Sequence, residues 1–381
     1  MNGRVNLVAA AFALTALSYG LARFAYGLLL PQIRTDLSLS ATAAGWIGGS
    51  AFAAYCLGIM FAFLVGDRLG SRAMLMIAGS AATIGMALVA LSPNRWVLGT
   101  AITLAGVSTG LTSPPLASAV AQRFDDEGRP KANGMINGGT AAGIVFSGLA
   151  AMAVAGAWRE LYVLFALIGG AVTLWLWFAM PAGSPKRNSR GLSLNTLKGP
   201  GLLGLCVSAF LMGASSTAIW TFGADILRHE LAFAETRIAL AWVVLGAAGI
   251  LGSATGLLTG RYGVGCVHRL ALLGMALGTV GLAAATKAPV LAFAAMGLFG
   301  ATYIISTGAL LIQGIACLPY RPDLGLGIPF LAIAAGQTVG APLFGAVLES
   351  MGSGTALLSS AAVACMAMVW RADRAIRQRP S

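Results

Sequence analysis

One arginine lies inside an otherwise apolar segment near the start of the chain. Arg23 stands about two turns before Pro31, with Tyr19 four residues before it and Tyr26 three residues after it. Residues at these spacings share one face of a helix. A charged side chain inside a membrane is costly and marks a candidate functional site. A guanidinium between aromatic rings suits a carboxylate, a phosphate or a flat aromatic solute.

Three roles are open for Arg23: contact with a solute, an internal ion pair that holds helices together, and a side chain that reaches the outer surface. Asp225, near the outer end of a later apolar segment, is the best acidic partner for it. Asp225 could instead bind a proton or be an exposed residue at a helix end. We expect Trp220, Thr221 and Tyr303 to contact the solute, although small hydroxyls in membrane helices are usually packing contacts.

The composition excludes a water-soluble protein. Of 381 residues, 58% are hydrophobic and 9% are charged, whereas an ordinary soluble domain carries about 25% charged residues. The net charge of +12 is confined to short loops and tails, without an aromatic-basic patch, so we expect no nucleic-acid partner. Two histidines and five scattered cysteines offer no metal, redox or triad spacing. We therefore expect no metal, no cofactor and no enzymatic activity.

Apolar runs of about 20 residues or more predict transmembrane helices. Twelve are expected, at roughly residues 6–29, 41–64, 73–91, 97–122, 133–156, 161–180, 200–226, 238–259, 269–286, 290–316, 326–349 and 354–371. With a cytoplasmic N-terminus, 17 of the 24 Lys and Arg residues fall in cytoplasmic loops and tails. This bias predicts a multi-pass protein of the cytoplasmic membrane with both termini inside.

The predicted helices divide into two halves. The longest polar stretch predicts a cytoplasmic linker at 182–198, between six-helix bundles at 1–181 and 199–381. Glycines recur between the halves, since Gly139, Gly143 and Gly148 are followed 197 residues later by Gly336, Gly340 and Gly345. Two parallel six-helix repeats are typical of secondary transporters.

The segment after the predicted helix at 41–64 carries charged and glycine residues at a distinctive spacing. They are Asp67, Arg68, Gly70 and Arg72. They match the signature Gly-x-Leu-Ala-Asp-Arg-x-Gly-Arg-Lys of the major facilitator superfamily, which the whole chain resembles. The chain departs at the first Gly (Phe63) and at one basic position (Ser71), and a weaker copy keeps Arg261 and Gly263 but has Gly260 where the Asp belongs.

The resemblance implies an all-α fold of twelve helices in two pseudo-symmetric halves that works by alternating access. It also implies that Asp67, with Arg68, Gly70 and Arg72, forms a cytoplasmic gate against the helix that starts near Leu326; a generic polar turn is the alternative. The family's arginine associated with proton coupling in the fourth helix is Ile102 here, so coupling by that route is in doubt.

We expect a secondary active transporter that moves a small organic solute, anionic or amphipathic, across the bilayer as a monomer. Ion coupling, with the proton as the ion, is expected. The sequence Gly340–Ala341–Pro342 comes close to a glycine-proline pattern of exporters and favours efflux. A passive facilitator and a non-transporting sensor built on a transporter fold are the alternatives.

Overall fold

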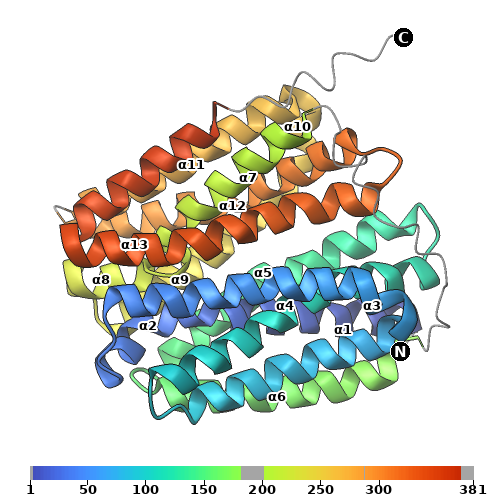
Figure 1. The fold of residues 1–381 in the computed structure, drawn as a ribbon, viewed down its shortest axis with the longest axis horizontal. Helices are drawn as coiled ribbons and strands as arrows, with labels where there is room; N and C mark the ends of the chain where they lie inside the picture. The colour runs from blue at the N-terminus through green and yellow to red at the C-terminus, as the bar shows by residue number, and fades with distance from the viewer. Residues whose placement is uncertain (1–2, 182–200, 287, 370–381) are drawn as a thin grey trace.

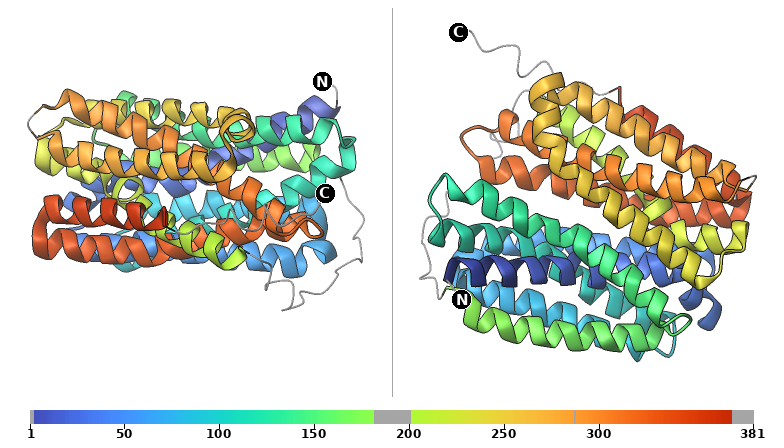
Figure 2. Two further views of the ribbon diagram at one scale, coloured as in Figure 1. Left: turned by 90° about the horizontal axis from the view of Figure 1, so that it is seen from above. Right: turned by 180° about the vertical axis from the view of Figure 1, so that it is seen from behind.

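The structure, a computed structural model, describes residues 3–181, 201–286 and 288–369, in which every regular element is helical. The helices run side by side in two groups, with the first part of the chain below the second in Figure 1. The view from behind separates the same two groups (Figure 2, right). The predicted linker at 182–198 lies outside the described residues.

The first half begins with one long run of helix. It comprises α1 (Gly3–Thr15), the π-helix η1 (Ala16–Phe24) and α2 (Ala25–Asp36). The remaining helices of this half are α3 (Ala41–Ala90), α4 (Arg95–Arg123), α5 (Gly128–Ala153) and α6 (Trp158–Ala179). The Ser40 hydroxyl caps the start of α3, and the Asn94 side chain caps the start of α4.

The second half repeats this order with more interruptions. Its helices are α7 (Leu202–Trp220), α8 (Gly223–Leu231), α9 (Glu235–Gly249), the 3-10 helix η3 (Ile250–Ala254), α10 (Thr255–Tyr262), α11 (Val264–Ala284), α12 (Val290–Cys317) and α13 (Pro322–Ala367). The segments α9, η3 and α10 form a single run from Glu235 to Tyr262.

The predicted number of membrane helices is confirmed. Ten helical segments of the described residues are long and apolar enough to cross a membrane. One of them, Leu324–Ala367, has 44 residues and is divided at Gly352, which has non-helical dihedral angles. This segment therefore supplies two helices, and α4, with 29 residues, completes the twelve.

Two predicted helix ends are wrong. The first helix continues through Pro31 to Asp36, so Arg34, expected in a loop, lies in α2. A proline is tolerated in a membrane helix because surrounding groups compensate for its missing hydrogen bond. The seventh predicted helix, at 200–226, instead ends at Trp220, and a separate helix begins at Gly223.

Glycines bring the backbones of α5 and the first helix into contact. A β-carbon added at Gly139 would lie 2.4 Å from the Phe12 carbonyl oxygen, and one at Gly143 would lie 2.3 Å from the Ala16 carbonyl oxygen. Real β-carbons do not approach backbone atoms this closely, so only glycine permits this crossing.

The same crossing recurs in the second half. A β-carbon at Gly336 of α13 would lie 1.9 Å from the Phe210 carbonyl oxygen, and one at Gly340 would lie 2.5 Å from the Ala214 carbonyl oxygen. The glycine repeat in the sequence therefore corresponds to one helix crossing that is built twice, as two pseudo-symmetric halves require.

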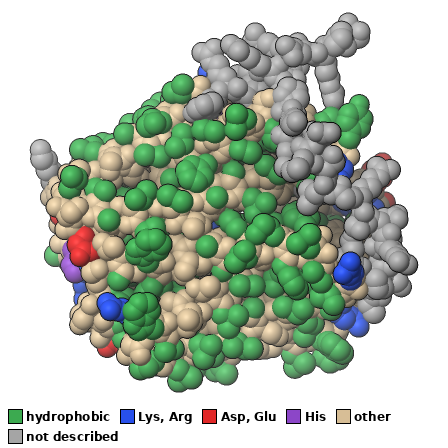
Figure 3. Space-filling view, viewed as in Figure 1, with side chains coloured by type: hydrophobic (Ala, Val, Ile, Leu, Met, Phe, Trp, Pro, Cys, Tyr) green, Lys and Arg blue, Asp and Glu red, His purple; other side chains and the backbone are tan. Residues whose placement is uncertain are grey.

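Apart from Arg23, charged side chains of the described residues gather near the two ends of the bundle. Figure 3 shows hydrophobic side chains over the face between the ends and most of the charged ones toward the edges. Gly3 and Phe124 lie at one end, where the Arg4 guanidinium is 5.5 Å from the Phe124 ring centre. We call this the terminal end, and the opposite end, which holds Asp36 and Glu349, the distal end.

Candidate functional site

Arg23 lies in the π-helix η1, in the middle of the first membrane helix. The Ala25 amide donates to the Gly20 carbonyl, five residues back, which is the π pattern. Gly20 packs on the backbone of Gly143, where an added β-carbon would come within 2.3 Å. Such helices are rare and occur frequently at functional sites, so the local backbone marks the same residue that the sequence does.

The Arg23 guanidinium is buried at the contact between the halves and has few hydrogen bonds. Its exposed fraction is 8%. Its Nη2 donates to the Gln337 side-chain oxygen in α13 at 2.6 Å, while its Nε is buried without a partner among the described residues. A guanidinium has five N–H donors. Most of its hydrogen-bonding capacity is therefore free, and no described carboxylate forms an ion pair with it.

Aromatic rings surround Arg23. The centre of its guanidinium lies 4.6 Å from the Tyr55 ring centre, 4.7 Å from that of Phe52, 5.1 Å from that of Phe24 and 5.9 Å from that of Tyr19. Cation–π contacts contribute about 0.5–2 kcal/mol each, more where water is excluded. The rings can therefore hold the cation inside the protein without neutralising its charge.

The second half supplies the rest of the site. The Gln337 side-chain nitrogen donates to the Ser216 hydroxyl at 3.1 Å and to the Tyr303 hydroxyl at 3.4 Å. The Trp220 ring stacks on the Phe24 ring at 4.2 Å and meets the Tyr303 ring edge-on at 5.2 Å. Two residues expected at the site are therefore close to Arg23. Trp220 is joined to it by the Phe24 ring, and Tyr303 is joined to it by the Gln337 side chain.

The structure separates Tyr26 and Thr221 from this cluster. The Tyr26 hydroxyl donates to the Ala44 carbonyl at 3.0 Å. The side chains of Tyr26 and Thr221 both pack against Gly48 in α3. Tyr26 and Arg23 both face α3, but Tyr26 lies about one turn farther along it, at Ala44 and Gly48, whereas Arg23 lies against Phe52 and Tyr55. Tyr19 remains near Arg23, and its hydroxyl is 2.9 Å from the Ser113 hydroxyl.

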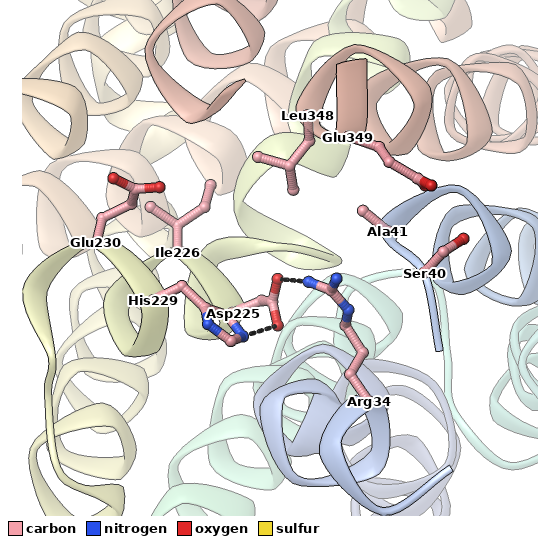
Figure 4. Close-up of a pocket in the computed structure, with 9 residues that line it drawn as sticks. All are labelled: Arg34, Ser40, Ala41, Asp225, Ile226, His229, Glu230, Leu348 and Glu349. Carbon is pink, nitrogen blue, oxygen red and sulfur yellow. Dashed lines mark hydrogen bonds and ion pairs between the residues drawn. The ribbon is translucent and has the colours of Figure 1, made fainter. Parts of the chain in front are cut away.

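Asp225 does not pair with Arg23, so that expectation is wrong. Its carboxylate pairs with Arg34 of α2, and its second oxygen lies 3.5 Å from the His229 ring nitrogen (Figure 4). Asp225 stands in α8, beyond the end of the α7 span, and is 2% exposed. The early end of α7 moves this carboxylate to the distal end, where Arg34 replaces Arg23 as its partner.

Asp225 lines a surface pocket of about 270 Å³ at the distal end, together with Arg34, His229, Glu230 and Glu349. Figure 4 shows the Asp225 side chain between His229 on its own helix and Arg34 on the other half. Burial raises the pKa of the Asp225 carboxyl, and the nearby Arg34 and His229 act in the opposite direction. A buried carboxyl next to a pocket can exchange a proton with the distal side.

The signature residues lie at the terminal end, in a break inside α3. Gly70 has φ 78°, a conformation that favours glycine, and Gly263 has the matching φ of 81° in the second half. Arg72 donates from Nε at 2.9 Å and from Nη2 at 2.5 Å to the Met180 carbonyl at the end of α6. Arg68 is exposed, and the side chain of Asp67 lies outside the described part of the chain.

Sequence reasoning missed three of the rings around Arg23. Phe24, Phe52 and Tyr55 are ordinary apolar residues in a membrane helix, and no local pattern distinguishes them. Phe52 and Tyr55 are three residues apart on α3 and so share a helix face. That spacing is the only local signal, and it identifies no partner.

These observations define a class: a polytopic α-helical membrane protein whose two related halves meet around a buried cation. Within that class, the sequence model of the Major Facilitator Superfamily matches residues 12–319. The chain belongs to this superfamily, and its members and structural neighbours are membrane transporters.

Curated relatives match parts of the chain. The uncharacterized transporter YgaY of Escherichia coli O157:H7 is 29% identical over 187 residues, which cover 48% of this chain and 45% of that protein. The transcription regulatory protein OpdE of Pseudomonas aeruginosa is 27% identical over 66% of this chain and 63% of that protein. The hexuronate transporter of Bacillus subtilis is 30% identical over 43% of this chain and 39% of that protein. The chain thus spans about half the length of the relatives it matches.

Solved structures share the fold over nearly the whole chain. The nucleoside transporter NupG, as its D323A mutant, has a TM-score of 0.81 at 14% identity and covers 97% of this chain and 98% of its own. The D-xylose-proton symporter has a TM-score of 0.78 at 15% identity and covers 96% of each chain. At these identities the likeness establishes the fold alone.

Proposed function

We propose that this protein is a secondary active transporter that moves a small organic anion by alternating access, with Arg23 as the residue that binds the anion. The observation that carries the proposal is the buried Arg23 guanidinium, which makes one hydrogen bond and no ion pair among the described residues. An anionic solute would pair with this guanidinium through charge-assisted, bidentate hydrogen bonds. Since Gln337 belongs to the other half, a solute at Arg23 would contact both halves.

Contacts between the halves at the distal end support alternating access. There Arg34 pairs with Asp225, the Gln32 side-chain nitrogen donates to Glu235 at 2.8 Å, and the Thr42 amide donates to Glu349 at 2.9 Å. These contacts close the distal end, which we propose faces the outside. Opening it would break all three, so they form the barrier on that side.

The opposite barrier involves the signature at the terminal end. We propose that Asp67, with Arg68, Gly70 and Arg72, controls opening toward the cytoplasm. The Phe63 ring lies about 3 Å from the position of a β-carbon on Gly327, near the start of α13. This proximity of α3 and α13 supports a gate between them.

We propose that the coupling ion is a proton, that Asp225 binds it and that the solute moves outward. The buried Asp225 carboxyl, its pocket and the neighbouring His229 support the proton site. Protonation of Asp225 from outside would weaken its pair with Arg34 and thereby open the distal end. Release of the solute to the outside would then be linked to proton entry.

A second candidate function is a sensor that binds the anion without moving it. The similarity to OpdE, named a transcription regulatory protein, favours this alternative. The hexuronate transporter moves a solute that bears a carboxylate, which favours the first proposal. Solute flux separates the two, because a sensor would bind the anion at Arg23 and carry none.

The test is flux of radiolabelled benzoate and glucuronate, two organic anions, in proteoliposomes with and without a pH gradient. Arg23→Lys keeps the charge and loses the planar fork, so it should reduce flux by roughly 10–100-fold, the value of a hydrogen bond to a charged group. Arg95→Gln is the matched control, because Arg95 is exposed at the distal end and should be dispensable.

The outcomes are distinct. Arg23-dependent flux of either anion supports the proposal, and loss of accumulation with an uncoupler separates an active transporter from a passive facilitator. Flux that persists unchanged in Arg23→Lys would refute the role of Arg23. Binding of an anion without any flux would favour the sensor.

A further inference from the structure

Two buried donors at the site have no acceptor. The Nε of Arg23 in the first half and the indole Nε1 of Trp220 in the second half both lack a hydrogen-bond partner among the described residues. Trp220 is 2% exposed. Both residues contact the Phe24 ring, with the Arg23 guanidinium 5.1 Å from its centre and the Trp220 ring stacked at 4.2 Å. Since buried polar groups are normally paired, these donors indicate a group that offers acceptors.

The acceptors that the second half brings to the site, by contrast, each already accept one hydrogen bond. The Gln337 side-chain oxygen accepts from Arg23, and the Ser216 hydroxyl accepts from Gln337 while it donates to the Gly213 carbonyl at 2.7 Å. The Tyr303 hydroxyl also accepts from Gln337. A solute rich in hydroxyl groups would therefore bring donors to a site that has few acceptors left. Each buried, unpaired hydroxyl weakens binding by roughly tenfold or more.

The remaining walls are flat and apolar. The rings of Phe24, Phe52 and Tyr55 flank Arg23, and Phe299 stands 6.0 Å from both Trp220 and Tyr303. Aromatic walls favour flat or apolar bodies, which pack edge-on or stacked against them. Apart from the hydroxyls of Tyr55 and Tyr303, they offer a polyol no hydrogen bonds.

The charge of the site matches a single negative charge. Arg23 is the one buried cation here, and the described acidic residues that form ion pairs lie elsewhere, such as Asp225 with Arg34 and Glu235 with Arg228 at the distal end. A monoanion would make the site neutral, whereas a dianion would leave one negative charge buried and unpaired.

We propose that the site selects a monocarboxylate with a flat, apolar body, such as an aromatic carboxylate, and discriminates against polyhydroxylated acids such as hexuronates. The carboxylate accepts from the free edge of Arg23 and from the Trp220 indole, and the body packs against Phe24, Phe52 and Tyr55. This inference rests on the proposed function, because it describes the solute of the same site.

The first experiment measures binding to the purified wild-type protein by isothermal titration. The probes are benzoate, glucuronate and benzamide, which keeps the ring and removes the charge. Benzoate should bind at least roughly tenfold more tightly than glucuronate, which carries several hydroxyls, and benzamide should not bind detectably. Wild-type protein suffices for this comparison, so it does not depend on the folding of a variant.

The second experiment assigns the two donors. Trp220→Phe keeps an aromatic ring and removes the indole N–H, so it should weaken benzoate binding by roughly 10–100-fold, the value of a hydrogen bond to a charged group. Trp46→Phe is the matched control, because Trp46 is 67% exposed and its replacement should leave benzoate binding unchanged.

The results separate the two levels of the argument. Tighter binding of glucuronate than of benzoate, with both lost in Arg23→Lys, would overturn the selectivity and leave the anion transporter intact. Equal binding of benzoate and benzamide would overturn the inference and remove the role of Arg23 with it. Unchanged benzoate affinity in Trp220→Phe would refute the assignment of the indole as a donor.

Discussion

The crossing of α5 with the first helix holds Arg23 in place, and replacing Gly143 with alanine tests it. The added β-carbon would lie 2.3 Å from the Ala16 carbonyl oxygen and 2.9 Å from its carbonyl carbon. These are backbone atoms that cannot rotate away, so the two helices must separate by about 1 Å to restore ordinary contact. Ala16 is the first residue of η1, so this movement would displace the π-helix that carries Arg23.

The expected cost follows from two opposing effects. Overpacking costs typically about 1–3 kcal/mol, and alanine favours a helix over glycine by about 1 kcal/mol. We therefore expect Gly143→Ala to lower the free energy of unfolding by up to about 2 kcal/mol. Gly138→Ala, on the same helix, is the matched control, because the nearest atom to its β-carbon would be 3.8 Å away. The control should be neutral or stabilising by up to about 1 kcal/mol.

The assay is thermal or denaturant unfolding of both variants in the same detergent, followed by benzoate binding. Gly143→Ala should be the less stable protein and should also bind benzoate more weakly, since Arg23 moves with its helix. Equal stability of the two variants would refute the claim that the two helices are too close at Gly143 to admit a β-carbon. Normal binding in a destabilised Gly143→Ala would show that the crossing does not position Arg23.

Three further predictions concern orientation, coupling and the signature segment. A reporter fused to the C-terminus should report the cytoplasm, because 17 of the 24 Lys and Arg residues fall in the loops and tails predicted to be cytoplasmic; a periplasmic signal would reverse the assigned orientation. Spin labels at Leu91→Cys and Val290→Cys, which are 74% and 78% exposed on opposite halves of the distal end, should move apart as the pH falls, in protein whose native cysteines are replaced. Burial raises the pKa of Asp225, so the change should begin above the usual carboxyl range; Asp225→Asn should give the longer distance at every pH, and a pH response that survives this change would exclude Asp225 as the proton site. Arg72→Ala should lower the free energy of unfolding by about 1.5–3 kcal/mol, because the Met180 carbonyl loses a charged donor, while benzoate affinity stays unchanged; unaltered stability would show that this cap is dispensable.

The helices could be predicted from the sequence because each depends on its own residues. Apolar runs long enough to cross the hydrocarbon core predicted the twelve helices of the structure. The glycine repeat predicted two related halves, and Gly143 and Gly340 pack on equivalent carbonyls in them. Helix ends were less predictable, since Pro31 lies within α2 and the end of α7 at Trp220 has no strong breaker in its sequence.

The candidate site could be predicted only in part. Arg23 stands out in the sequence because a charge in an apolar run is unusual whatever surrounds it. Its partners do not, because Gln337 is more than 300 residues away and Phe52 and Tyr55 look like ordinary membrane residues. The pairing of Asp225 with Arg34 also depends on where α7 ends and α8 begins.

The sequence by itself therefore determined that the chain crosses a membrane in two related halves with one cation inside, since hydrophobicity, charge and repetition are properties of the chain. Only the tertiary structure decided what faces that cation: aromatic rings from α3, the amide of Gln337 from α13, and no described carboxylate. The physical reason is that the packing of helices far apart in the chain determines which side chains surround a buried charge, and no local pattern in the sequence records that packing.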